Sequence, residues 1–206
     1  MPLTTYAELQ DAIGSWLNRD DLVPTIPTFI DAAEAEMSRT VRHWRMEKRS
    51  TADLTTQYSA LPSDFYEPIR LSLTSGTTYR LELAGQAEMM DLRQRGDNVA
   101  RRPRYYAMTD GSIEVFPTPD STYTLEMVYY SKIVPLSVDN TSNWLLEYFP
   151  DAYLYGALMH SAPFLGEDNR LAVWSTLYGN AINAINTDSD KAKFGGSGHR
   201  MKIRSF

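Results

Sequence analysis

Histidines are the side chains that most often transfer protons or bind metal ions near neutral pH. This chain has three, at His43, His160 and His199. None has a second histidine or a cysteine at metal-ligand spacing, so no zinc site is predicted. His43 lies near the end of a predicted helix, where the helix dipole stabilises a surface cation. His160 lies in an apolar stretch and is expected to be a core or interface residue.

Other patterns that could support catalysis are incomplete. The segment GGSGH, residues 195–199, resembles a nucleophile elbow only in part, because G-x-S-x-G requires a glycine at position 199. The chain has no G-x-x-x-x-G-K loop to hold phosphates. The acid pairs Asp20–Asp21 and Glu167–Asp168 fall at predicted helix ends, where capping explains them. We therefore expect no catalytic residues, no cofactor and no metal, and a protein that is not an enzyme.

Length and composition limit the class of protein. A chain of 206 residues has the size of one domain or two small ones. Hydrophobic residues make up 43% and charged residues 22%, as in soluble globular proteins. With no cysteine, disulfides and thiolate metal sites are excluded. No apolar run approaches the roughly 20 residues of a membrane span, and the first residues do not resemble a secretory signal. We expect synthesis in the cytoplasm and no membrane partner.

Charge is distributed unevenly along the chain. The net charge is −6, yet residues 191–206 contain five bases and no acid. The remaining residues, 1–190, hold 15 bases and 26 acids, a net charge of −11. An acidic body with a short basic end indicates that residues 189–206 form a flexible tail with its own partner. The alternative is a solvated terminus without a partner.

Helical periodicity marks the two ends of the chain. The residues Thr5 to Glu8 form a capping box, which predicts a helix to about Asn18. A second helix follows Thr25, and its apolar stripe consists of Ile30, Ala33, Met37, Val41 and Trp44. Pro150 begins a further helix, which Pro163 should kink or end. The last helix has a stripe of Leu171, Trp174, Tyr178, Ile182 and Ile185.

The middle of the chain has the period of two that is typical of strands. In residues 123–130 the apolar side chains Leu125, Met127 and Tyr129 should face one way. The pair Asp110–Gly111 predicts a hairpin, and residues 85–96 should form a short helix. We therefore predict an α+β fold with a helical bundle from residues 1–44 and 142–188. An antiparallel domain of roughly four to six strands, residues 45–141, is inserted into it.

Aromatic residues are more numerous than a core of this size requires: four Trp, thirteen Tyr and seven Phe. Tyr and Trp are favoured in protein–protein interfaces. In residues 145–165 we expect Leu154, Leu158 and Phe164 to lie in the core. The tyrosines of this stretch cannot all face inward, so at least one should contact a neighbouring copy; the candidates are Tyr148, Tyr153 and Tyr155.

Five segments carry a resemblance to a known family. They are TYAELQDAIGSWLNRDDL at the start, LPSDFYEPIRL, RPRYYAM, IEVFPTPDSTYTLEMVYYSKIVPLS, and NWLLEYFPDAYLYGALMHSAPFL. In order and spacing they resemble the head-to-tail adaptor proteins of tailed bacteriophages, those of short-tailed phages and, more distantly, the tail tubular protein A type. The resemblance covers nearly the whole chain.

The resemblance implies a structural virion protein at the head–tail junction. Such adaptors form a ring, typically dodecameric, between the portal protein and the tail or nozzle protein. The ring extends the channel through which genomic DNA passes without sequence-specific binding. The C-terminal segment of these proteins commonly reaches toward the portal, which suggests as portal-binding residues Phe194, His199, Arg200, Met201, Lys202 and Arg204.

Two other functions remain open from the residues alone. Exposed tyrosines of the sheet could form a carbohydrate-binding module of the tail. The segment RRPRYYAM combines bases with two tyrosines, as in grooves for single-stranded nucleic acid. However, Tyr105 and Tyr106 should point to opposite faces of a strand, so that one enters the core. Binding there would depend on Arg101, Arg102 and Arg104.

Overall fold

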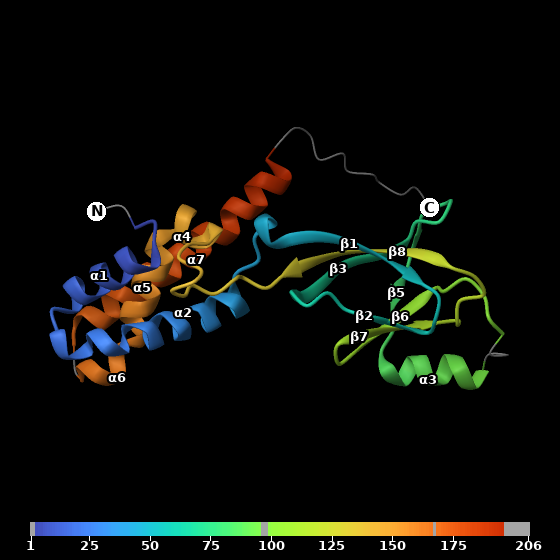
Figure 1. Ribbon diagram of the computed structural model, residues 1–206, viewed down its shortest axis with the longest axis horizontal. Coiled ribbons are helices and arrows are strands. Elements are labelled where there is room, and N and C mark those ends of the chain that lie inside the picture. Colours follow the sequence, from blue (N-terminus) through green and yellow to red (C-terminus); the bar gives the residue numbers. More distant parts are fainter. Residues whose placement is uncertain (1–2, 96–98, 167, 196–206) are drawn as a thin grey trace, which may run out of the picture. The chain divides into compact units, whose positions relative to one another are not determined.

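The computed structural model describes residues 3–95, 99–166 and 168–195. These residues form two compact units. The bundle unit draws on residues 1–45 and 133–206, and the sheet unit on residues 46–132. The fold is α+β, as predicted, with the sheet unit inserted between the two parts of the helical unit (Figure 1).

The bundle unit is helical. Its α-helices are α1 (Tyr6–Leu17), α2 (Ile26–Thr40), α4 (Trp144–Tyr148), α5 (Pro150–His160), α6 (Ala162–Leu165) and α7 (Arg170–Phe194). A 3-10 helix, Asp20–Thr25, joins α1 to α2, and a short 3-10 turn, Trp44–Met46, precedes the first strand. Residues 189–194, for which the sequence suggests part of a flexible tail, belong to α7.

Local signals explain where the helices begin and end. The Thr5 hydroxyl accepts a hydrogen bond from the Glu8 amide, and the Glu8 carboxylate accepts one from the Thr5 amide, which completes the predicted capping box. Asn18 ends α1 in the left-handed conformation. Pro150 occupies the first turn of α5, where its missing amide costs nothing. The predicted break near Pro163 is present, because α5 ends at His160 and the short α6 follows.

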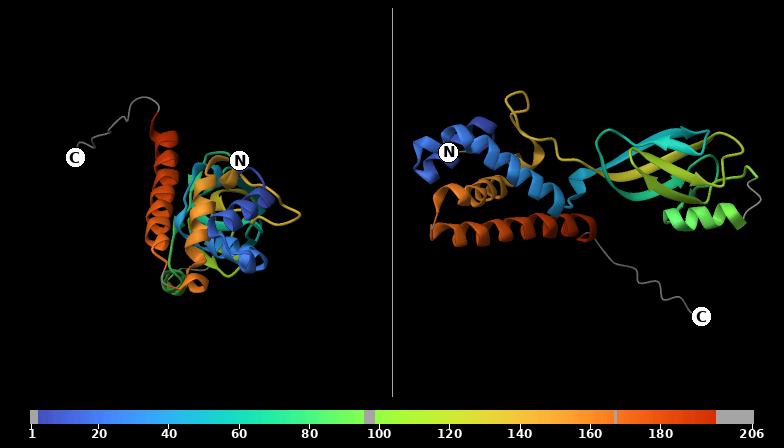
Figure 2. Two further views of the ribbon diagram at one scale, coloured as in Figure 1. Left: turned by 90° about the vertical axis from the view of Figure 1, so that its left-hand side faces the viewer. Right: turned by 90° about the horizontal axis from the view of Figure 1, so that it is seen from below.

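Helix α5 is the centre of the bundle unit. It packs against α7 on one side and against α2 and α1 on the other (Figure 2). Gly156 allows this close packing: a Cβ placed there would lie 3.0 Å from a ring carbon of Tyr178 on α7 and 3.1 Å from the Cβ of Ala33 on α2. The predicted core residues Leu154 and Leu158 are buried on α5.

Two apolar residues that the sequence assigns to the core are instead exposed. Helix α2 ends at Thr40, so the predicted stripe does not continue to Trp44, which is 39% exposed. Phe164 is 48% exposed, although one side of its ring packs on Phe29 at a centroid distance of 5.2 Å. In both cases the helix whose apolar period was extended to the residue ends before it, α2 at Thr40 and α5 at His160.

The sheet unit contains two four-stranded sheets rather than one sheet of four to six strands. The first has the order β1 (Glu47–Leu54), β8 (Tyr123–Ser131), β3 (Phe65–Leu73) and β4 (Tyr79–Arg80). The second has the order β2 (Tyr58–Ala60), β7 (Ser112–Phe116), β6 (Tyr105–Thr109) and β5 (Glu82–Leu83). Pairing is antiparallel except between β5 and β6.

The core of the sheet unit draws side chains from both sheets. Leu125, Met127 and Tyr129 of β8 are buried on one face, as their alternation predicts. Ile113 and Val115 of β7 join them from the second sheet. The predicted hairpin connects β6 to β7, with Gly111 at a φ of 66° that favours glycine. Helix α3 (Gln86–Arg95) packs on β6.

Candidate interaction surfaces

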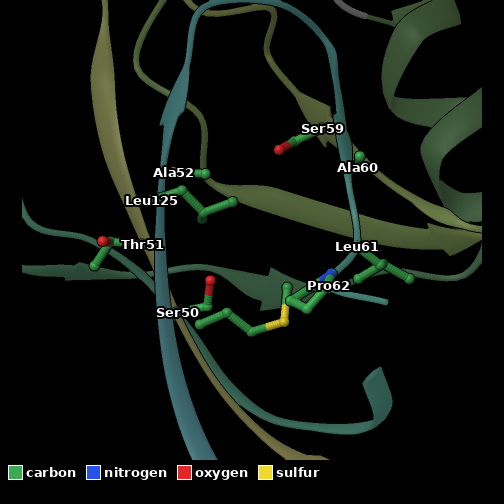
Figure 3. Close-up of a pocket in the computed structure, with 9 residues that line it drawn as sticks. Ser50, Thr51, Ala52, Ser59, Ala60, Leu61, Pro62 and Leu125 are labelled. Atoms are coloured by element: carbon green, nitrogen blue, oxygen red, sulfur yellow. The ribbon is translucent and has the colours of Figure 1, made fainter. Parts of the chain in front are cut away.

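Within the described ranges, no group of three or more His, Cys, Asp or Glu side chains is placed to hold a metal ion. A hollow of about 200 Å³ lies in the sheet unit between β1, β8 and the segment from Ser59 to Pro62. The polar side-chain atoms among its labelled residues are hydroxyls of Ser50, Thr51 and Ser59 (Figure 3). Hydroxyls alone, without a base to activate them, do not constitute a nucleophilic site.

The environment of His43 differs from the predicted surface position, because the ring is completely buried. It stacks on Trp144 at 5.0 Å between centroids and contacts Phe149 edge-on. Nδ1 accepts a hydrogen bond from the amide of Arg45, and Nε2 lies 3.2 Å from a carboxylate oxygen of Asp188. Burial lowers the pKa of His43, despite the opposing effect of Asp188. Both ring nitrogens are engaged, so this histidine serves packing.

The backbone that carries His43 is held by side chains of α7. Asn186 accepts a hydrogen bond from the amide of Arg42 at 3.0 Å, and the Ser189 hydroxyl accepts one from the amide of Trp44, also at 3.0 Å. These bonds satisfy amides that follow the end of α2, where the helix supplies no partner. His160, expected in the core or an interface, is half-buried and lies 2.9 Å from a carboxylate oxygen of Glu36.

The three tyrosines proposed for a subunit interface occupy different environments. Tyr153 is completely buried in its own chain, where its hydroxyl donates to Glu34 at 2.8 Å and accepts from the Asn143 amide at 2.7 Å. It is therefore not accessible to a neighbouring copy. Tyr148 is 49% exposed and Tyr155 is partly exposed. The candidates for an interface narrow to these two.

Each exposed tyrosine belongs to a small aromatic surface that also carries an arginine. The Trp44 surface consists of Trp44, Arg45 and Tyr148: the Arg45 guanidinium carbon lies 4.7 Å from the centroid of Trp44 and 3.9 Å from that of Tyr148. Such cation–π contacts hold exposed rings in place.

The Trp16 surface consists of Trp16, Tyr155 and Arg170. Its two rings meet edge-on at 6.0 Å, and Arg170 donates to the carbonyl of Trp16 at 3.0 Å. The sequence analysis placed Trp44 in the apolar stripe of the second helix, so it did not predict the exposure of this residue.

Helix α7 presents a third surface, which the sequence reasoning did not identify. Its buried side, formed by Trp174, Tyr178, Ala181, Ile185 and Ser189, includes three of the predicted stripe residues. Residues 171–187 contain no charged side chain, although nine of them are exposed. This neutral face consists of Ala172, Val173, Ser175, Thr176, Gly179, Asn180, Asn183, Ala184 and Thr187. Exposed helix faces of soluble proteins normally carry charge. The uninterrupted run of neutral residues is therefore the feature of the sequence that could have indicated this surface.

The predicted portal-binding residues are only partly described. Phe194 is the last residue of α7 and is exposed. The other five lie outside the described residues: His199, Arg200, Met201, Lys202 and Arg204.

The segment RRPRYYAM lies at the beginning of β6 in the sheet unit. Tyr106 enters the core while Tyr105 remains half-buried on the other face, as the alternation predicts. Arg102 and Arg104 line a hollow together with Tyr79 and Arg80, which precede β5 in the chain, and Arg101 joins them in an adjoining hollow. The Arg102 guanidinium carbon lies 3.5 Å from the centroid of Tyr79.

None of the helices in the described part of the chain is long and apolar enough to cross a membrane. The aromatic content of the surfaces described above is typical of protein interfaces.

Comparison with known proteins identifies the family of the chain. No curated protein matches the chain. A family model described as SU10 adaptor protein matches residues 4–201 and so spans both units. The chain belongs to the SU10 adaptor protein family, and it is a structural adaptor of the phage head–tail junction.

Proposed function

We propose that copies of this chain assemble into a closed ring between the portal and the tail, extend the DNA channel and support the next tail component. A ring subunit needs two different, complementary flanks, because a head-to-tail interface must close on itself. The observation that carries the proposal is the presence of three aromatic or uncharged surfaces on one bundle unit: the Trp44 surface, the Trp16 surface and the neutral face of α7.

The exposed rings of the two aromatic surfaces are the residues we assign to subunit contacts. Tyr148 and Tyr155 each offer large area with few rotatable bonds, which is why tyrosine is common at interface centres. Arg45 and Arg170 already stack on rings of their own chain, so little rotamer entropy is lost when a partner covers them.

The charge distribution suits a channel and a docking tail. An acidic body repels the phosphates of DNA and lets the duplex slide, because nonspecific affinity comes from neutralising phosphates with bases. The basic tail, with five bases and no acid in residues 191–206, attracts an acidic surface of the portal. We assign portal contacts to Phe194, His199, Arg200, Met201, Lys202 and Arg204.

The ring is tested by measuring mass in solution for the full chain, alone and mixed with its portal protein. We expect a ring with the portal, and we expect the variants Tyr148→Ala and Tyr155→Ala to weaken it without lowering the melting temperature. Tyr58→Ala is the control, because Tyr58 is an exposed tyrosine of the sheet unit. A chain that stays monomeric and leaves the portal unbound would refute the proposal.

The tail is tested separately by pull-down on the portal at several salt concentrations. The triple variant Arg200→Ala, Lys202→Ala and Arg204→Ala should lose binding at a salt concentration where the unmodified chain still binds. Arg19→Ala, which removes an exposed arginine paired with Asp21, is the control. If the triple variant bound the portal as well as the unmodified chain at every salt concentration, the tail would not be part of the portal contact.

A further inference from the structure

Four arginines lie near one another in the sheet unit although two separate segments supply them. Arg80 comes from β4, and Arg101, Arg102 and Arg104 come from the segment before β6. The parallel pairing of β5 with β6, in which Glu82 lies opposite Tyr105, brings the two segments together. The amide of Glu82 also donates to the carbonyl of Arg104 at 2.9 Å.

These arginines line two adjoining hollows. One, of about 260 Å³, is lined by Arg101, Arg102, Arg104, Tyr105, Phe116 and Pro117. The other, of about 240 Å³, is lined by Tyr79, Arg80, Glu82, Arg102, Pro103, Arg104 and Tyr105. Both therefore contain Arg102 and Arg104, and among the described residues that line the two hollows, four are arginines and Glu82 alone carries a carboxylate. We call this region the arginine pocket.

Two arginines of the arginine pocket have no carboxylate partner in the part of the chain that the structure describes. Among the described residues, neither Arg80 nor Arg104 forms an ion pair, and both side chains are exposed. Arg102 is held against Tyr79, and its Nε is buried without a hydrogen-bond partner. Elsewhere in the sheet unit the pattern is different, since Arg49 and Arg70 both pair with Glu126. Guanidinium donors such as those of Arg80 and Arg104, exposed and grouped beside further arginines, are a site for oxyanions.

The exposure of the aromatic rings in the pocket indicates which class of anion can bind there. Single-stranded nucleic acid needs open rings on which bases can stack. Tyr79 is already covered by Arg102 on one face, and Tyr105 packs on the small core beneath α3. Part of each ring is therefore covered, although Tyr79 is still 38% exposed. With four guanidinium groups beside two partly covered rings, the chemistry that dominates the pocket is that of guanidinium groups with carboxylates.

We propose that the arginine pocket binds an acidic segment of a partner protein, with side-chain carboxylates entering the two hollows. Each hollow has the volume of a side chain or two, which suits adjacent Asp or Glu residues better than an extended polyanion. An arginine guanidinium can donate two parallel hydrogen bonds to one carboxylate, so the bases contribute orientation as well as charge. This site lies in the sheet unit and does not depend on whether the bundle unit forms a ring.

The test uses the free full-length chain and two fluorescent probes of equal length, a glutamate-rich peptide and an oligothymidylate, with binding followed by anisotropy at low and moderate salt. We expect the peptide to bind more tightly. The double variant Arg80→Ala, Arg104→Ala should weaken peptide binding about tenfold, since each exposed ion pair contributes a few-fold.

Arg95→Ala is the matched control, because Arg95 is an exposed arginine of the same unit whose partner is Asp91. It should leave peptide binding unchanged, and thermal melts should show all variants folded. The proposal would be overturned if the double variant bound the peptide as tightly as the unmodified chain does. Absence of peptide binding would overturn it as well. If the oligothymidylate binds more tightly than the peptide and the double variant abolishes that binding, the pocket would be reassigned to nucleic acid. None of these outcomes affects the mass measurement that tests the ring.

Discussion

Glu34 places a carboxylate inside the bundle unit, where it joins two distant parts of the chain. Its Oε1 accepts from the amide of Leu136 at 2.9 Å and from the hydroxyl of Tyr153 at 2.8 Å. Asn143 donates to that same hydroxyl and to the carbonyl of Val134. The network fixes the segment that returns from the sheet unit, and it explains why one tyrosine of α5 points inward.

The first prediction concerns the hydroxyl of Tyr153. Tyr153→Phe leaves the ring in place but removes a donor to Glu34 and an acceptor for Asn143, so buried polar groups lose partners. We expect the free energy of unfolding to fall by about 1–3 kcal/mol, measured by urea denaturation. Tyr148→Phe, on a half-exposed ring, should change it by less than about 0.5 kcal/mol. Equal effects of the two changes would contradict the buried network.

The second prediction concerns the pH dependence of stability. Burial raises the pKa of Glu34, and its two hydrogen bonds oppose this effect in part. The folded state therefore holds the proton more tightly than the unfolded state. The stability that this group contributes is present below its unfolded pKa and is lost as the pH rises through its folded pKa.

Glu34→Gln removes this titration and keeps an acceptor oxygen. The free energy of unfolding of the unmodified chain minus that of the variant should therefore fall as the pH rises from about 4 toward 7. Urea denaturation of both proteins across this range measures the difference. Because other carboxylates titrate in both proteins, their contributions cancel in the difference. A difference that rises with pH would show that the carboxylate is stabilised in its charged form.

Among the elements, α5 depends most on close approach of its neighbours. Gly156 faces Tyr178 on one side and Ala33 on the other, with no room for a methyl group at ordinary contact distance. At Gly179 on α7, by contrast, a methyl group would meet no heavy atom within 4 Å. The two glycines therefore serve different purposes, although both lie within helices.

The third prediction compares Gly156→Ala with Gly179→Ala. Alanine favours a helix by roughly 1 kcal/mol at either site, but overpacking at position 156 costs about 1–3 kcal/mol. We expect Gly179→Ala to stabilise the chain and Gly156→Ala to be less stable than it by about 1–3 kcal/mol, as measured by denaturation of the monomer. If both changes stabilise the protein equally, α5 is not tightly packed between α2 and α7.

At the scale of the whole molecule, the two units are covalently joined at only two places, near Arg45 and near Lys132. Within the sheet unit these ends lie side by side, because Glu47 of β1 is paired with Tyr130 of β8 and the Ser131 hydroxyl donates to the carbonyl of Met46. The unit has its own core. A domain with adjacent ends and its own core can be inserted into another without disturbing it.

The fourth prediction is that residues 46–132 fold in isolation. Circular dichroism should show strand structure, and thermal unfolding should be cooperative. Residues 46–121, which lack β8 between β1 and β3, are the control and should not fold, because two strands lose their partner. An unfolded 46–132 fragment would mean that the sheet unit requires the bundle unit for stability.

Much of the local structure was predictable from the sequence. The capping box at Thr5, the hairpin at Asp110–Gly111 and the alternation along β8 depend on backbone geometry and on neighbours a few residues away. The α+β class followed from the change of period along the chain. The family followed from the order and spacing of whole segments, which matches the family model over residues 4–201.

Other features depended on contacts between residues far apart in the chain. The sequence alone could not determine that His43 is buried against Trp144, that Tyr153 is held by Glu34 while Tyr148 stays exposed, or that Arg80 joins Arg102 and Arg104. Periodicity shows that a helix or strand has an apolar and a polar face, whereas the burial of a particular side chain depends on which distant element covers it. For this protein the sequence determined the fold class, the order of the helical and strand segments, and the family. The tertiary structure decided which aromatic residues and which arginines are available to partners, because only packing between distant segments leaves a side chain covered or exposed.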